Sequence, residues 1–181
     1  MTLIIFTEEP SMKATLTCLI PKLGLDARTV RVIGFDGVGD MENELPRQLR
    51  ALRASAETIL ILRDNDNGIC AARKSKLMQM AVAAGVAPRT KVRIVCQMLE
   101  AWFIGDIGAL VASRHFRKPV PRRLERCDPD EQPNPKKELS KLRDGYREIT
   151  AANAIARHLN PEVNRSASFR NTIRAIRTLA T

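Results

Sequence analysis

Hydrophobic and polar positions change their period repeatedly over the first hundred residues. Short apolar runs rich in β-branched residues alternate with segments in which apolar residues recur every three or four positions. The runs are typical of buried strands and the longer segments of amphipathic helices. We expect strands at Leu3–Phe6, Val30–Ile33, Thr58–Leu62 and Val92–Val95. Helices are expected over residues 11–23, 40–53 and 70–84, and from Met98 to Ile104.

This alternation predicts the fold class and the domain organisation. Strand–helix–strand crossovers of this length are right-handed and produce a parallel sheet. Residues 1–106 are therefore expected to form an α/β domain, with a mainly parallel four-stranded sheet flanked by helices. Residues 107–181 show no convincing strand and contain a proline-rich stretch, Pro119–Pro135. We expect them to form a C-terminal helical extension packed on the domain, with helices near residues 107–114, 136–144, 150–158 and 166–180.

Charge is distributed unevenly between these two parts. The chain has 30 Lys and Arg against 20 Asp and Glu, a net charge of +10. Residues 107–181 hold 16 basic and 8 acidic residues, whereas residues 1–106 hold 14 and 12. A basic surplus favours a polyanionic partner such as DNA or RNA. The longest early apolar run, Leu3–Phe6, is too short for a signal peptide or a membrane span, so we expect no membrane partner.

The four cysteines exclude some classes of protein. They include no Cys-x-x-Cys pair, which disfavours a zinc ribbon or a disulfide scaffold, and they are interpreted as buried small apolar groups. A reducing compartment, the cytoplasm, is the expected location.

Acidic residues follow two of the predicted strands. Glu8 comes just after the first strand, and Asp64 and Asp66 come just after the third. Ligands bind at the carboxyl ends of strands in open parallel sheets, so these side chains would share one crevice if the two strands are neighbours. Glu100, near the start of the helix after the fourth strand, could reach the same rim. Asp, Asn and Gly also cluster in ordinary solvated turns, and for residues 64–68 alone that is the simpler interpretation.

Crowded carboxylates favour one kind of ligand. At about 4 Å and an effective dielectric of about 20, one like-charge pair costs on the order of 4 kcal/mol. Such a cluster needs raised pKa values or a cation, and hard oxygen ligands suit Mg2+ or Mn2+. A metal so held can polarise a phosphoryl oxygen or supply hydroxide, which suggests phosphodiester hydrolysis or transfer. Gly68 is expected to permit the turn that brings both aspartates to one ion.

Four motifs, spaced along the chain, resemble those of a known family. They are Glu8-Glu9-Pro10-Ser11, Leu62-Arg63-Asp64-Asn65-Asp66-Asn67-Gly68-Ile69-Cys70, Leu99-Glu100-Ala101-Trp102-Phe103-Ile104-Gly105-Asp106 and Asn164-Arg165-Ser166-Ala167-Ser168-Phe169. Together they resemble the Toprim domain of primases, topoisomerases and overcoming-lysogenisation-defect nucleases. A closer resemblance, over nearly the full length, is to the Toprim-like domain-of-unknown-function family 4276. The resemblance implies a Toprim-like (Rossmann-like) fold and a divalent metal.

The resemblance also implies roles for individual residues. Glu8 corresponds to the Toprim acid that serves as general base or acid, and Asp64 with Asp66 to the metal pair. Glu100 corresponds to a later acidic residue that some relatives add to the metal ligands. Glu9 stands where many relatives have Gly, so either glutamate could be the functional one. Arg147 stands near a lysine of relatives; an arginine cannot act as a neutral base and would only stabilise charge.

The last motif and the residues after it suggest contacts with phosphate. Arg165, Ser166 and Ser168 could donate hydrogen bonds to phosphate at a helix N-terminus. The alternative is structural, with Ser166 as an N-cap and Phe169 in the core. A basic face made by Arg170, Arg174 and Arg177 could follow a nucleic-acid backbone, although such faces are often only solvated.

The preferred hypothesis is a Mg2+- or Mn2+-dependent nuclease or related phosphotransfer enzyme acting on nucleic acid. A non-catalytic nucleic-acid-binding or regulatory module of the same fold is a second hypothesis, and a small-phosphate-processing enzyme is a third. The sequence leaves open the choice between DNA and RNA. It also leaves open whether the chain forms a homo-oligomer or is controlled by a neighbouring regulatory protein.

Overall fold

The computed structural model describes residues 2–180, and the elements alternate as strand and helix up to residue 95. The strands are β1 (Leu3–Thr7), β2 (Val30–Gly34), β3 (Thr58–Asp64) and β4 (Thr90–Val95). The helices of this part are α1 (Pro10–Lys22), α2 (Val38–Ala51) and α3 (Cys70–Ala83), with a 3-10 turn at Ala87–Arg89. The later helices are α4 (Leu99–Ile104), α5 (Ile107–Ala112), α6 (Arg122–Arg126), α7 (Pro135–Ser140), α8 (Glu148–Ala156) and α9 (Ala167–Ala180), with a 3-10 turn at Pro129–Glu131.

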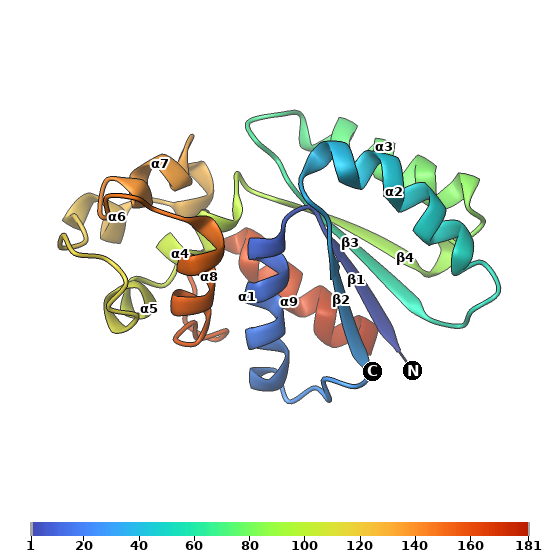
Figure 1. Cartoon of the computed structure of the whole chain (residues 1–181), viewed down its shortest axis with the longest axis horizontal. Helices are drawn as coiled ribbons and strands as arrows, with labels where there is room; N and C mark the ends of the chain where they lie inside the picture. Colours follow the sequence, from blue (N-terminus) through green and yellow to red (C-terminus); the bar gives the residue numbers. More distant parts are fainter. Residues whose placement is uncertain (1, 181) are drawn as a thin grey trace.

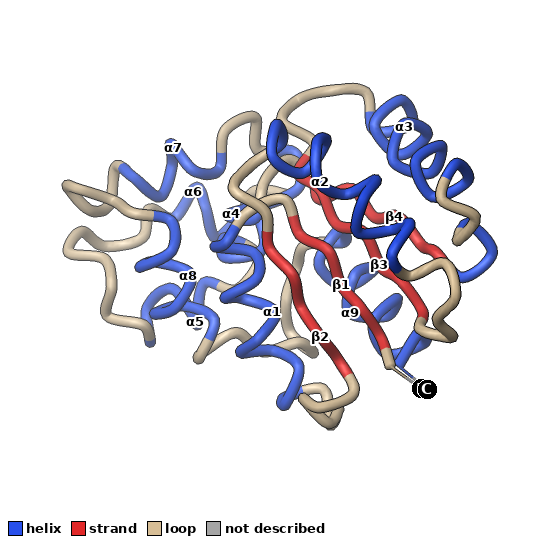
Figure 2. The backbone as a smooth tube through the Cα atoms, turned by 45° about the vertical axis from the view of Figure 1, so that its right-hand side comes forward, coloured by secondary structure: helices blue, strands red, loops and turns tan. Residues whose placement is uncertain are grey.

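The strands form one parallel sheet in the order β2-β1-β3-β4, with helices on both faces (Figures 1 and 2). Alternate residues of the buried strands β1 and β3 serve two hydrophobic cores. Leu3 and Ile5 pack with α1 and α9, whereas Ile4 and Phe6 pack with α2 and α3. The expected fold class, a Toprim-like α/β sheet flanked by helices, is confirmed.

The strand order creates a topological switch point. The chain leaves β1 through α1 to reach β2 on one side, and then returns through α2 to place β3 on the other side of β1. The carboxyl ends of β1 and β3 therefore lie side by side with their following loops diverging, which is where open α/β sheets bind ligands. Thr7 pairs with Leu62, so Glu8 lies level with Arg63 and close to Asp64.

Residues after β4 contribute in two ways. Helices α4 to α8 gather to one side of the sheet, whereas α9 returns to cover the sheet face next to α1 (Figure 1). Both parts share one hydrophobic core with the sheet, and Lys22 at the end of α1 donates to three carbonyls at the end of α8. Division of the chain into a domain of residues 1–106 and an extension of residues 107–181 remains a proposal.

Several element boundaries depart from the sequence expectations; for example, α7 ends at Ser140 and not near residue 144. Helix α1 begins at Pro10, so Ser11 is inside the helix and its hydroxyl donates to Glu9 Oε2 at 3.1 Å. Helix α2 begins at Val38 and continues through Pro46. Strand β3 extends to Asp64, which is therefore held by the sheet, and the proline-rich stretch contains α6. Among the described residues no helix has both the length and the apolar character needed to cross a membrane.

Candidate functional site

Glu8 directly follows β1, one of the two inner strands, and is buried beside a buried arginine. Its side chain is 5% exposed, and Arg63 Nε lies 3.5 Å from Glu8 Oε2 without forming a hydrogen bond. Burial raises the pKa of Glu8 to about 7; Arg63 opposes the rise, and Asp66 and Glu9 add to it. A carboxyl with a pKa near neutrality can accept or release a proton at working pH.

Arg63 is itself fixed by a second acid. Its Nη1 donates to Glu42 Oε1 at 2.9 Å, and Lys76 Nζ lies 2.7 Å from Glu42 Oε2. Lys76 and Arg63 lower the pKa of Glu42. This chain of charges holds Arg63 against Glu8 from the α2 side of the sheet. No role for Arg63 was predicted from the sequence, although a charged residue in an otherwise apolar buried strand was a signal.

Asp64 lies at the centre of a group of negative charges. It is 5% exposed, its Oδ2 accepts from the backbone N–H of Leu99 at 3.2 Å, and its Oδ1 has no hydrogen-bond partner among the described residues. Burial raises its pKa well above the ordinary value, and Glu100, Glu9 and Glu8 raise it further. The fold therefore places carboxylates from the segment after β1, from the end of β3 and from α4 close together, as the strand order implies.

The loop after β3 presents Asp66 near Glu8. Asp66 is exposed and raises the pKa of Glu8. Asp66 and Asn67 take left-handed backbone conformations with φ of 45° and 56°, which aspartate and asparagine tolerate better than most residues. These two residues make the turn, in place of the expected Gly68. The backbone N–H groups of Asn65 and Asp66 both donate to the Gln97 carbonyl, which joins this loop to the end of β4.

Glu100 approaches the same edge from the first turn of α4. It is 4% exposed, and Tyr146 Oη donates to its Oε1 at 3.1 Å. Burial raises the pKa of Glu100, while Tyr146 and Lys136 oppose the rise. Burial and Glu100 also raise the pKa of the Tyr146 phenol, which keeps it a hydrogen-bond donor. Tyr146 and Lys136 were missed in the sequence because both reach the site only through folding of the C-terminal part.

Arg147 follows Tyr146 in the chain, but its side chain is exposed to solvent, whereas Tyr146 contacts Glu100. Arg147 is the N-cap residue of α8. Lys136, from α7, is the cation that acts on Glu100, and it pairs with Glu148 at the start of α8. A role for Arg147 in charge stabilisation stays a prediction.

The donor set fits a hard divalent cation in its chemistry. Glu8 Oε2 and Asp64 Oδ1 are buried oxygens without hydrogen-bond partners among the described residues, and Asp64 is flanked by three glutamates that raise its pKa. A cation would replace the missing partners and relieve the repulsion. Within residues 2–180, no three His, Cys, Asp or Glu side chains are already arranged to hold a metal ion. Binding would therefore require the carboxylates to ionise and turn toward one ion.

The expected phosphate donors at the start of α9 are used within the protein. Asp130 accepts from Ser166 Oγ and from the backbone N–H of Ser168, so a carboxylate of the chain occupies the place given to phosphate. Arg165 donates to the carbonyls of Ile104, Leu124 and Cys127. Their direct contact with phosphate stays a prediction, and the geometry shows them joining α9 to α4, α6 and the turn at residues 129–131.

The basic face of α9 is exposed and has a defined direction. Ser168 Oγ, near the start of α9, accepts from the backbone N–H of Cys96, just after β4, at 3.1 Å. The carbonyl of Leu179, near the end of α9, accepts from Thr58 Oγ1 at the start of β3. The helix therefore runs antiparallel to the strands. Arg170 lies nearest the carboxyl edge, and Arg174 and Arg177 continue away from it. Arg177 pairs with Glu162, and Arg170 caps two carbonyls of its own segment.

Comparisons with known proteins agree with this architecture. The family model described as "Domain of unknown function (DUF4276)" matches residues 7–177. A solved structure, the C-terminal region of the Burkholderia pseudomallei OLD protein, has a TM-score of 0.62 and 16% sequence identity. That alignment covers 99% of this chain and 98% of the other. Comparison with curated proteins finds no match. At this identity the OLD structure establishes similarity of fold alone.

Proposed function

The chain belongs to the DUF4276 family, and from that premise and its carboxylate cluster we propose that it is a divalent-metal-dependent nuclease or related phosphotransfer enzyme. The single observation that carries the proposal is the burial of Asp64 among three glutamates at the switch point of the sheet. Unneutralised charge of this kind costs several kcal/mol and is typical of functional sites. The similarity of fold to the OLD C-terminal region supports the same class of reaction.

Four residues would hold the metal, with Glu9 as the alternative glutamate. They are Glu8, Asp64, Asp66 and Glu100. Bound Mg2+ or Mn2+ would polarise a phosphoryl oxygen and acidify a coordinated water. Residues of the chain supply positioning: Arg63 holds the Glu8 carboxylate, Leu99 N–H fixes Asp64, and Tyr146 orients Glu100.

Glu8 is the residue best suited to move a proton. Without a metal its pKa of about 7 lies close to working pH, which gives it appreciable populations of both protonation states. Arg63 stabilises the ionised form, and the surrounding acids favour the protonated one. Lys136 and Arg147 would stabilise charge that develops on phosphate.

Nucleic acid is the proposed substrate class because a basic track leads to this edge. Arg170, Arg174 and Arg177 follow the exposed side of α9 from the carboxyl edge toward the opposite edge of the sheet. Phosphates spaced along a backbone suit such a row, and the contacts would be sequence-independent. We propose that these three arginines contact the nucleic acid. Both DNA and RNA are to be tested as substrates.

The test is cleavage of labelled DNA and RNA in Mg2+ or Mn2+ by the full chain and two variants. Asp64→Asn and Asp66→Asn are each expected to lower the rate by about 100-fold or more, because each removes a proposed metal ligand. Asp144→Asn is the matched control, since its side chain is 98% exposed and pairs only loosely with Lys118. Cleavage that is unchanged in both variants would contradict the proposal.

A second function is favoured by one observation. Burial raises the pKa of each of the three buried acids, Glu8, Asp64 and Glu100, so protonation can neutralise them. A non-catalytic nucleic-acid-binding module could keep these groups protonated without a metal. Calorimetric titration with Mg2+ separates the two functions, because the module gives no saturable heat.

A further inference from the structure

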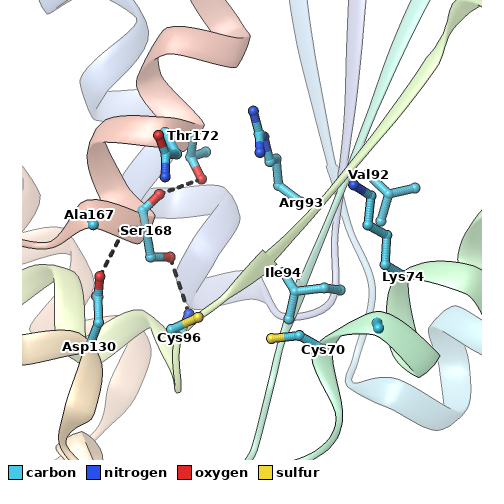
Figure 3. A pocket seen from close by; sticks show the side chains of 12 residues that line it. Cys70, Lys74, Val92, Arg93, Ile94, Cys96, Asp130, Ala167, Ser168 and Thr172 are labelled. Atoms are coloured by element: carbon cyan, nitrogen blue, oxygen red, sulfur yellow. Dashed lines mark hydrogen bonds between the residues drawn. The ribbon is translucent and has the colours of Figure 1, made fainter.

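Two cysteines from different elements face one another in a cavity beside the carboxyl edge (Figure 3). Cys70 is the first residue of α3, and Cys96 directly follows β4. Their side chains point toward each other, and Cys70 is one of the groups that raise the pKa of the Cys96 thiol. Cys70 is exposed and Cys96 is half-buried, so a small reagent reaches the first and the second lies behind it.

The cavity has the size and charge for a small anionic reagent. Its volume is about 310 Å³, and Lys74 of α3 and Arg93 of β4 line it together with the two cysteines. Arg93 Nε is buried and has no hydrogen-bond partner among the described residues. Asp130 lies across the cavity from Lys74 in Figure 3, and its carboxylate is already hydrogen-bonded to Ser166 and Ser168. The positive charges of Lys74 and Arg93 therefore favour carboxylates on an incoming molecule.

We propose that Cys70 and Cys96 are a redox-active dithiol that exchanges with an anionic low-mass disulfide, of which glutathione disulfide is the probe. The Cys70 thiolate attacks one sulfur of the disulfide, the S–S bond breaks, and one glutathione leaves and takes a proton. The Cys96 thiol then loses its proton, attacks Cys70 Sγ and expels the second glutathione. The protein thiols lose two electrons and two protons, and the reagent gains them as two thiols.

The order of the two steps follows from the surroundings of each thiol. Burial raises the pKa of Cys96 to about 11, and Cys70 and Asp130 add to the rise. Cys96 is therefore a protonated thiol at neutral pH, and the exposed Cys70 reacts first. Once Cys70 is bonded to glutathione, its contribution to the raised pKa of Cys96 is removed, so the second thiol ionises more readily.

The disulfide would connect the two loops that carry the acidic site. The chain from Asp64 through Asp66 leads into Cys70, and the chain from Cys96 leads through Gln97 to Leu99 and Glu100. Gln97 already accepts from Asn65 and Asn67 across these loops. Oxidation would tether them covalently and restrict the carboxylates. This regulatory consequence rests on the proposed function, whereas bond formation does not.

The test is mass analysis of the native chain after incubation with glutathione disulfide and alkylation of the remaining thiols. We expect loss of two alkylatable thiols, at Cys70 and Cys96, with no glutathione retained. Cys96→Ser should retain glutathione on Cys70, whereas Cys70→Ser should stay unmodified at residue 96. Cys18→Ser and Cys127→Ser are controls that should still form the bond. A wild-type chain that keeps all its thiols, or keeps glutathione on Cys70, overturns the proposal.

Two further measurements separate the parts of the proposal. Lys74→Glu should slow reaction with glutathione disulfide severalfold and leave reaction with the neutral hydroxyethyl disulfide unchanged; an equal effect on both reagents removes the anion preference. Mg2+ titration of the reduced and oxidised chains should give different affinities. Equal affinities would overturn the regulatory consequence while leaving the disulfide itself in place.

Discussion

Buried aspartates at two places in this molecule, Asp106 and Asp64, differ in how completely their oxygens are hydrogen-bonded. Asp106, 6% exposed at the start of α5, accepts from Ala109 N–H through one oxygen and from Asn160 N–H through the other. Asp64, 5% exposed, has one backbone donor and three neighbouring glutamates that raise its pKa. The comparison shows that this fold can satisfy a buried aspartate where the role is structural. At the acidic edge, Glu8 Oε2 and Asp64 Oδ1 have no hydrogen-bond partner among the described residues, which supports the proposed cation site.

The largest expected effect is a pH dependence of folding that arises at the acidic edge. The pKa of Glu8 is about 7 in the folded chain against an ordinary value of 4.5, so the folded state binds this proton more tightly. Stability from this group is fully present below about pH 4.5 and is lost as pH rises to about 7, by on the order of 3 kcal/mol. Denaturant unfolding without metal, between pH 4.5 and 8, measures it.

A matched variant isolates this contribution from the rest of the protein. Glu8→Gln should reduce the loss of stability between about pH 4.5 and 7, whereas Glu125→Gln, at an exposed position on α6, should show the same loss as the wild type. His115 acts in the opposite direction because burial and Arg143 lower its pKa. The difference between wild type and variant removes that background. An unchanged pH profile in Glu8→Gln would show that Glu8 is not the proton-binding group.

The same substitution at the two aspartates sharpens the comparison directly. Asp106→Asn places an amide NH2 group against one of two backbone N–H donors. We therefore expect the free energy of unfolding to fall by about 2 kcal/mol. Asp64→Asn removes a negative charge from beside Glu8, Glu9 and Glu100, so stability without metal should be unchanged or higher. Urea midpoints at neutral pH measure both. Equal destabilisation by the two variants would remove the distinction between the two groups of acids.

Binding of Mg2+ to the carboxylates at the acidic edge should stabilise the folded chain. Mg2+ at tenfold above its dissociation constant adds about 1.4 kcal/mol to stability, provided that it binds only the folded chain. Its apparent affinity should rise with pH through about 7, because ionisation of Glu8 must precede coordination. Thermal unfolding with and without Mg2+ measures the effect, with Asp64→Asn as the control that should lose it. A shift that is equal in both chains would contradict binding at this edge.

The smallest effect concerns the basic face of α9. Arg174→Ala should lower the slope of log affinity against log salt by about 1, since each phosphate contact with duplex DNA releases about 0.9 of a counterion. Arg28→Ala, a 91% exposed arginine in the loop before β2, is the matched control. Fluorescence anisotropy with one labelled duplex over a range of salt concentrations measures both. Equal slopes in the two variants would exclude α9 from the contact surface.

Much of the α/β part could be predicted because its information is local. The run Thr58–Leu62 and the helical period after Cys70 define elements by burial alone, and crossover handedness then makes the strands parallel. Glu8 and Asp64 were placed at one edge by that reasoning. The starts of α1 and α2 were predicted at residues 11 and 40 and lie at Pro10 and Val38; a proline such as Pro10 can occupy the first position of a helix.

The site was only partly predictable for a physical reason. Its acids follow strand ends, which sequence shows, but their partners come from distant segments. Tyr146 reaches Glu100, and Asp130 reaches Ser166 and Ser168, through packing of short helices with no strong periodicity. A Ser-rich helix start looks the same in sequence whether phosphate or a carboxylate of the same chain occupies it.

By itself, the sequence determined the order of elements, the parallel sheet and the set of carboxylates at its edge, because hydrophobic period and crossover handedness act over short stretches of chain. Only the tertiary structure decided which of those charges are neutralised. Ion pairs and hydrogen bonds depend on distances of a few ångströms between segments far apart in the chain, and packing alone sets those distances. Arg63 beside Glu8, and Cys70 facing Cys96, are consequences of that packing.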